Sequence, residues 1–225
     1  MAKEARSRGS IIYKLLIVIL MVALVATILF PKSLWNQEAQ NTQLCRENME
    51  HILYTEYVYL SEKNTFTDTL SKAIDLIKND TTGMLLRNFE NTDSLLSAKI
   101  MGFLKKKDTT AAAIVDSLAE YGRLYGIDTT SALILDSLRT FPQFNEKIDS
   151  IALYTLDNMG TCPTVHDPYF VQVVDTSAIK VVNIKCPLDS LDSVAVSRDF
   201  KLSKIGGLRI SNHGAIEDGE KSWNR

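Results

Sequence analysis

The chain has 225 residues, of which 45% are hydrophobic and 23% are charged, and its formal net charge is −2. This length suits one domain or two small ones, and the apolar share is large enough to build a buried core. Ten glycines and five prolines exclude a low-complexity chain, and the near-neutral charge argues against a nucleic-acid-binding protein.

A single apolar segment near the N-terminus dominates the hydropathy of the chain. Residues 11–30 contain one charged side chain, Lys14, and reach the ~20 residues that an α-helix needs to cross ~30 Å of hydrocarbon. A cleaved secretory signal is the alternative, but its apolar core is about 7–15 residues long and ends at a small-x-small site, which residues 31–37 do not offer. We therefore predict a transmembrane helix over residues 11–30.

The charges around this segment predict its orientation. The basic side chains of residues 1–10 precede the apolar run, so the positive-inside rule places the N-terminus in the cytoplasm. The rest of the chain then lies beyond the inner (cytoplasmic) membrane, in the periplasm or outside the cell. The long stem of Lys14 lets its ammonium group reach the headgroups, and Trp35 has the position of an interfacial anchor.

Residues 31–62 are predicted to form an amphipathic stalk helix, either continuous with the membrane helix or bent from it at Pro31. Its apolar positions, which include Met49, Ile52 and Leu53, recur at steps of three and four residues. This stripe either packs on the chain's own domain or binds another subunit as a helix in a groove.

Residues 63–158 are predicted to form several short helices, because an Asp precedes each of several apolar-periodic stretches. The carboxylates can accept hydrogen bonds from the first helical turn, so they are interpreted as N-caps rather than as a catalytic acid–base pair. Gly126 is a candidate helix stop. The candidate caps are Asp68, Asp93, Asp108, Asp128 and Asp149.

Residues 159–225 are predicted to form a small antiparallel sheet. Residues 169–174 and 179–184 are rich in β-branched side chains and flank a four-residue connection, which is typical of a hairpin. Residues 200–210 are expected to add one or two strands, and Asp218-Gly219 marks a last turn. The predicted fold class is α+β, with helices that cover one face of the sheet.

The cysteines near the C-terminus allow two interpretations. Cys162 and Cys186 each precede a proline at opposite ends of the predicted hairpin, and outside the cytoplasm this pair can form a disulfide worth about 3 kcal/mol. The alternative is a metal site in which His166 and His213 complete a Cys₂His₂ set. We expect the disulfide, with no metal and no cofactor, and an unpaired, packed Cys45.

The N-terminus resembles that of type IV pilins and type II secretion pseudopilins, which have a basic leader, a hydrophobic helix and an amphipathic continuation. The leader-like part ends at Gly9, the mature-like chain starts at Ser10, and Pro31 stands where many pilins bend this helix. Lys14 departs from the family, which has a Glu there that pairs with a neighbouring subunit's terminal amine. The likeness covers residues 1–60, and the two Cys-Pro dipeptides resemble the cysteine-closed loop of some pseudopilins.

We therefore expect a non-enzymatic, single-pass membrane subunit of a cell-envelope assembly, pseudopilin-like in plan. The expected partners are membrane lipid and other envelope subunits, further copies of this chain among them, and no nucleic acid. The predicted membrane and partner interface comprises Lys14, Pro31, Trp35, Met49, Ile52 and Leu53.

Two other functions stay open at this point. The chain could be a membrane-anchored extracytoplasmic binding module or accessory subunit, or it could carry a metal-binding or enzymatic domain. An enzyme is disfavoured because the sequence has no G-x-S-x-G, P-loop, G-x-G-x-x-G or H-E-x-x-H motif.

Overall fold

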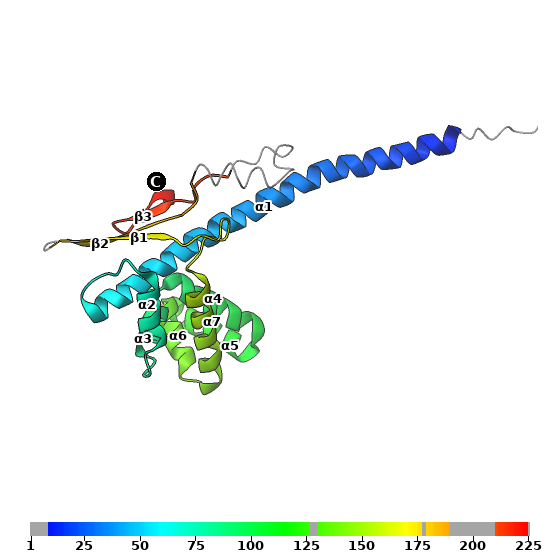
Figure 1. Ribbon diagram of the computed structural model, residues 1–225. Coiled ribbons are helices and arrows are strands. Elements are labelled where there is room, and N and C mark those ends of the chain that lie inside the picture. The colour runs from blue at the N-terminus through cyan, green and yellow to red at the C-terminus, as the bar shows by residue number, and fades with distance from the viewer. Residues whose placement is uncertain (1–8, 127–129, 177–178, 190–209, 225) are drawn as a thin grey trace, which may run out of the picture. The chain divides into compact units, whose positions relative to one another are not determined.

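The computed structural model describes residues 9–126, 130–176, 179–189 and 210–224 (Figure 1). The chain divides into two compact units: residues 1–42 with 189–211, and residues 43–188 with 212–225. Helix α1 (Gly9–Lys63) begins in the first unit and ends in the second. The predicted α+β class is confirmed, since helices precede a small antiparallel sheet.

The N-terminal part of α1 has the properties of a membrane span. Residues 12–29 are exposed along their whole length although nearly all of them are apolar. In the part of the chain that the structure describes, α1 is the one helix long and apolar enough to cross a membrane. The helix continues through Pro31, although a proline inside a helix removes one backbone hydrogen bond.

The C-terminal part of α1 is the central helix of the second unit. Met49, Ile52 and Leu53 are buried there, so the apolar stripe packs on the chain's own domain. The alternative in which these three side chains face a partner is not supported, because solvent does not reach them. In the second unit this part of α1 lies between the helices α2–α7 and the sheet (Figure 1).

Among the described residues, six helices follow α1 and share one apolar core. Each presents a stripe of aliphatic or aromatic side chains inward, as the sequence periodicity predicts. Their bounds are α2 (Leu70–Lys78), α3 (Met84–Thr92), α4 (Ser94–Lys107), α5 (Thr109–Tyr125), α6 (Ser131–Arg139) and α7 (Pro142–Asn158). The fully buried core side chains include Phe89, Leu96, Ile100, Leu104, Leu135, Leu138, Phe144 and Ile148.

Two of the predicted Asp caps and the predicted glycine stop are confirmed. The Asp93 carboxylate accepts from Leu96 N at 2.9 Å at the start of α4, and Asp108 accepts from Ala111 N at 3.2 Å at the start of α5. Gly126 ends α5 in the left-handed conformation, at φ 64°.

The other predicted caps need correction. Helix α7 begins at Pro142, so Asp149 lies inside it and caps nothing; proline at the first helical position needs no hydrogen-bond partner for its nitrogen. Thr69 rather than Asp68 holds the N-cap position of α2. Thr130 caps α6, and Asp128 lies outside the described residues.

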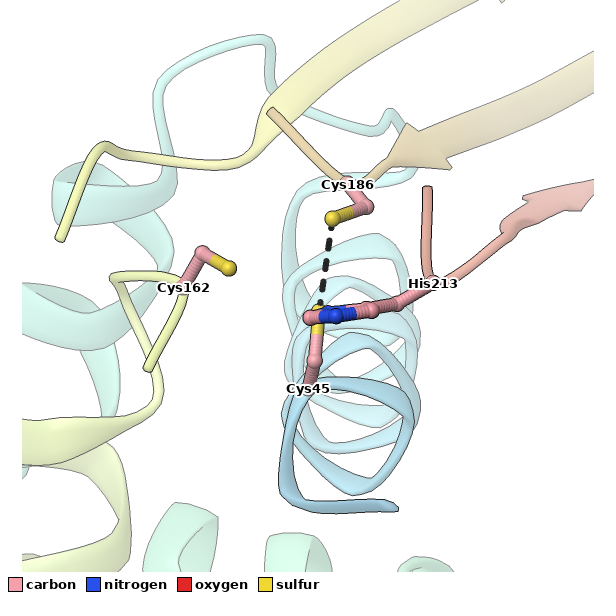
Figure 2. A group of neighbouring side chains, drawn as sticks. All are labelled: Cys45, Cys162, Cys186 and His213. Atoms are coloured by element: carbon pink, nitrogen blue, oxygen red, sulfur yellow. Dashed lines mark hydrogen bonds between the residues drawn. The ribbon is translucent and has the colours of Figure 1, made fainter. Parts of the chain in front are cut away.

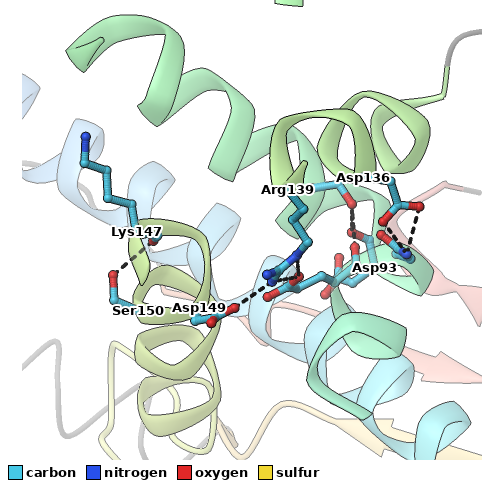
Figure 3. A network of polar contacts seen from close by, with 9 residues as sticks. Asp93, Asp136, Arg139, Lys147, Asp149 and Ser150 are labelled. Carbon is cyan, nitrogen blue, oxygen red and sulfur yellow. Dashed lines mark hydrogen bonds and ion pairs between the residues drawn. The ribbon is translucent and has the colours of Figure 1, made fainter. Parts of the chain in front are cut away.

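A network of two ion pairs, buried at Arg139 and Glu90, joins three of these helices (Figure 3). Arg139 on α6 donates to Glu90 on α3 and, at 2.7 Å, to Asp149 on α7. Burial raises the pKa of Glu90 to about 7, and the Arg139 guanidinium opposes that rise. The two carboxylates therefore pair with the buried Arg139 guanidinium and connect the three helices. This pairing is the role of Asp149, which does not cap a helix.

The sheet has the strand order β1-β2-β3-β4, with every neighbouring pair antiparallel. The predicted hairpin is confirmed: Asp175 pairs with Lys180, which leaves four residues in the connection. The Asp218-Gly219 turn is also confirmed, with φ of 52° and 76° as a type I′ turn requires. The strands are β1 (Phe170–Asp175), β2 (Lys180–Lys185), β3 (Ala215–Glu217) and β4 (Glu220–Lys221), followed by a 3₁₀ turn, Ser222–Asn224.

The strands expected over residues 200–210 lie outside the described residues, apart from Ile210.

Polar contacts hold the sheet against α1 within the second unit. Lys221 Nζ lies 2.6 Å from a Glu50 carboxylate oxygen, and the Arg46 guanidinium sits 5.4 Å from the centre of the Trp223 ring. Arg46 Nε also donates to the His213 carbonyl at 3.0 Å. These contacts bring the segment before β3 to the middle of α1.

Candidate metal centre

Three cysteines and one histidine meet at the junction of α1, the sheet and the loop after α7 (Figure 2). The sulfur atoms of Cys45, Cys162 and Cys186 and a ring nitrogen of His213 all lie within 4.8 Å of one another. All four side chains are buried. The sulfurs of Cys45 and Cys186 are 3.6 Å apart. The group therefore has the composition and size of a set of metal ligands.

Cys45 and Cys162 are positioned by backbone contacts on each side. Cys45 lies on α1, and the Tyr169 hydroxyl donates to its carbonyl oxygen at 3.3 Å. Cys162 opens a tight loop in which its own N–H donates to the Asp167 carbonyl at 2.9 Å and its carbonyl accepts from His166 N at 2.8 Å. These bonds fix both main chains before any ligand arrives.

Cys186 and His213 are held together by the segment that joins them to the sheet. Cys186 N donates to the Gly214 carbonyl at 3.2 Å. The Asn212 side-chain amide donates to the carbonyl oxygens of Cys186, at 3.3 Å, and Leu188, at 2.6 Å. One asparagine thus clamps the residue before His213 to the end of β2.

Gly214 is required beside His213. Its φ is 120°, and a Cβ atom there would lie 2.7 Å from both Ser222 Oγ and a ring carbon of Trp223. A side chain at this position would push the His213 backbone away from the group, so the glycine helps to set the position of the imidazole.

The thiols change one another's pKa values. Hydrogen bonds from Cys186 and Cys45 lower the pKa of Cys162, and a hydrogen bond with His213 adds to that effect. Hydrogen bonds with Cys162 and Cys186, together with burial, raise the pKa of Cys45. The thiolate is the form of cysteine that binds metals and exchanges disulfides.

The structure does not contain the expected Cys162–Cys186 disulfide, since all three cysteines are free. The predicted hairpin is present and the Cys162 loop folds back, but Cys45 of α1 also joins the group, with its sulfur 3.6 Å from that of Cys186. The sequence predicts a packed, unpaired Cys45 on the helical stripe, whereas in the structure it contacts Cys186, which is 141 positions away in the chain.

The predicted Cys₂His₂ set contains three of the four residues that the fold brings together. His166 is exposed, with φ 61°, and is not one of the grouped ligands; its role is that of a turn residue in the Cys162 loop. Cys45 takes the place in the group that the sequence analysis gave to His166. The position of Cys45 on the apolar stripe indicated in the sequence that it is buried, but not which side chains it contacts.

The remaining predicted site residues lie in the N-terminal part of α1. Lys14 and Trp35 are exposed, and Pro31 is part of the helix. The first two are accessible to lipid or to a partner, as the interface prediction requires.

The chemistry open to the buried group follows from its donors. Three thiols and one imidazole can hold a metal ion, and the sulfurs of Cys45 and Cys186 can be oxidised to a disulfide after a small movement.

Comparison of the chain with protein-family models, curated proteins and solved structures finds no match.

Proposed function

We propose that this chain is a non-enzymatic, single-pass membrane subunit of a cell-envelope assembly, pseudopilin-like in plan. The observation that carries the proposal is helix α1 itself. Its residues 12–29 are apolar and exposed, and its residues 45–58 form the buried centre of a folded domain. One helix thus supplies both an anchor and the core of what it anchors.

The length of the exposed apolar segment supports a membrane span. Eighteen helical residues rise about 27 Å, close to the ~30 Å of hydrocarbon in a bilayer. In water, a row of leucine, isoleucine and valine side chains that nothing covers would strongly favour association. Lipid removes that cost, and the basic residues before the segment favour a cytoplasmic N-terminus at the inner membrane.

The character of the buried Cys/His group supports a non-enzymatic role. Its four donors are enclosed, whereas a catalytic metal site keeps one position open to substrate. A structural role for the group fits a subunit whose work is assembly.

A membrane-anchored binding module is the second candidate, and a patch on the helical region favours it. Tyr121 and Tyr125 on α5 are exposed, with ring centres 4.5 Å apart, and Leu124 between them is exposed as well. Aromatic side chains that keep most of their surface in solvent are frequent anchors of protein interfaces.

The anchor is tested by charge insertion. The full chain should stay in the membrane pellet after washing with alkaline carbonate. Val18→Arg combined with Val22→Arg should release it, because each Arg costs about 3 kcal/mol at the middle of a membrane helix. Gln37→Arg with Gln40→Arg, at exposed positions beyond the segment, is the matched control and should stay in the pellet. Release of the unmodified protein would overturn the anchor.

Two measurements separate the pseudopilin plan from a simple anchored module. An intact mass that starts at Ser10 would indicate leader cleavage of the pilin type, and one that starts at Met1 would favour the simple anchor. Lys14→Leu should weaken co-purification of a membrane partner if the ammonium group pairs with an acidic side chain in that partner's helix. Unchanged co-purification would remove this pairing from the proposal.

A further inference from the structure

We propose that Cys45, Cys162, Cys186 and His213 bind one Zn²⁺ ion in a closed, four-coordinate structural site. The proposal concerns the second unit alone and does not depend on the membrane anchor. It rests on the distances among the four donors, on their burial and on the hydrogen bonds that hold their backbones.

The distances fit a tetrahedral ion better than a disulfide. Zn–S bonds of about 2.3 Å at tetrahedral angles place two ligand sulfurs about 3.8 Å apart. Cys45 Sγ and Cys186 Sγ are 3.6 Å apart, and the other donor atoms lie within 4.8 Å of one another. A disulfide needs about 2.05 Å between sulfurs, and any one disulfide would leave the third thiol buried beside His213 without a covalent partner.

The donor set selects zinc among the common metals. Thiolates and imidazole are ligands for Zn²⁺, and Cys₃His is one of its standard structural sets, whereas Ca²⁺ and Mg²⁺ require oxygen ligands. An iron–sulfur cluster places several irons and sulfides between its cysteines, which needs a wider spacing than these donors have. The group therefore has room for one ion and not for a cluster.

The burial of the donors makes the site structural. The exposed fractions are 0% for Cys45 and Cys162, 3% for Cys186 and 2% for His213. Four protein donors complete a tetrahedron and leave no position for a substrate or a reactive water. Zinc bound here would connect α1, the loop after α7, the end of β2 and the segment before β3.

The backbone around the donors is already arranged for binding. Asn212 bonds the carbonyl of Cys186, Arg46 bonds the carbonyl of His213, and Tyr169 bonds that of Cys45. A site held in this way loses little conformational entropy when the ion enters. Coordination also protects thiolates from oxidation, so the site is compatible with a domain outside the cytoplasm.

The first experiment uses the unmodified full chain. The protein is purified in detergent without chelators, and its metals are measured by mass spectrometry. We expect about one zinc per chain and no free thiol by a thiol reagent until a strong chelator is added, after which all three thiols react. Replacement of zinc by Co²⁺ should produce the intense visible absorption of tetrahedral cobalt thiolate.

Variants then test the four ligands against a matched control. Cys45→Ser and His213→Ala should each weaken zinc binding by more than the ten- to hundred-fold loss expected for an outer-shell contact. His166→Ala, at the exposed histidine of the same loop, should keep full zinc content. If a ligand variant does not fold, the chelator and cobalt measurements on the unmodified chain decide the question.

Three results would overturn the proposal. The first is a chain that holds well below one zinc and has a mass lower by two hydrogen atoms until it is reduced, which would show a disulfide. The second is a stoichiometric metal other than zinc. The third is an equal loss of zinc in His166→Ala and His213→Ala.

Discussion

The two parts of helix α1 invert the usual relation between polarity and exposure. Residues 12–29 are almost entirely apolar, yet all of them are exposed. Residues 45–58 carry several polar side chains that are buried: Asn48, Glu50, His51, Thr55 and Glu56. The same helix geometry runs through both parts, so the difference lies in what surrounds each part and not in the helix.

This contrast teaches what each environment demands of a side chain. An exposed apolar segment of this length is suited to a membrane, where its side chains require no specific hydrogen-bond partner. Buried polar side chains need particular hydrogen bonds, since a group that loses its water without a replacement costs about 1–3 kcal/mol. In α1, His51 Nδ1 lies 2.5 Å from an Asp93 carboxylate oxygen and Glu56 Oε2 accepts from Thr67 N at 2.9 Å, whereas Glu56 Oε1 is buried without a hydrogen-bond partner.

The largest expected difference between the two parts concerns apolar truncation. Ile52 is fully buried, and Ile17 is 58% exposed. Ile52→Ala should lower the free energy of unfolding of the second unit by about 2–5 kcal/mol, because it leaves a cavity in packed surroundings. Ile17→Ala should leave that free energy unchanged. Urea unfolding in detergent, followed by circular dichroism, compares the two, and equal losses would contradict the separate environments.

A buried carboxylate in α1 should make stability depend on pH. Burial raises the pKa of Glu56 to about 7, against a smaller opposing effect of the Thr67 N–H. The folded chain therefore holds this proton more tightly than the unfolded chain, so its stabilising contribution is full below about pH 4.5 and is lost as the pH rises through 7.

Replacing Glu56 with Gln removes that dependence. At pH 8, Glu56→Gln should raise the free energy of unfolding by up to about 3 kcal/mol, the equivalent of the pKa difference, and at pH 4 it should change little. Glu62→Gln, on an exposed position of the same helix, is the control and should be neutral at both pH values. A loss of stability at pH 8 would mean that the folded chain stabilises the ionised Glu56 carboxylate rather than destabilising it.

The contact between α1 and the start of α4 should show a smaller effect. His51→Leu removes the partner of the buried Asp93 carboxylate and should cost about 1–3 kcal/mol. Asp93→Asn keeps an N-cap for α4 and removes the charge, so the double variant should lose less than the sum of the single variants. Additive losses in urea unfolding would show that the two side chains do not act as a pair.

Local patterns account for the parts of the fold that the sequence predicted correctly. The hairpin register follows from two β-branched stretches and a four-residue connection, and the caps at Asp93 and Asp108 follow from an Asp at the start of an apolar period. The prediction that Asp149 is an N-cap was wrong, because an Asp before an apolar stretch also occurs inside a helix. There the carboxylate of Asp149 pairs with Arg139 of another helix.

The proposed metal ligands could be predicted only in part, because their grouping is nonlocal. Cys162, Cys186 and His213 lie near the hairpin, so chain order suggested them as a set. Cys45 joins them only because α1 packs beside the sheet, through contacts such as Lys221 with Glu50. No spacing in the sequence records that packing, and the predicted candidate His166 is not part of the group that the fold brings together.

The smallest predicted effect concerns backbone conformation alone. In α1 the surroundings distinguish the two parts, whereas Gly126 and Gly102 both lack close neighbours. A Cβ atom added at Gly126 or at Gly102 would meet no other atom within 4 Å, but Gly126 has φ 64° and Gly102 lies inside α4. Gly126→Ala should cost about 1 kcal/mol, because an L-residue is strained in the left-handed region. Gly102→Ala should instead stabilise the chain by about 0.5–1 kcal/mol through its higher helix propensity. Thermal unfolding measures both, and a loss at Gly102 as large as that at Gly126 would show that packing, not backbone conformation, controls these positions.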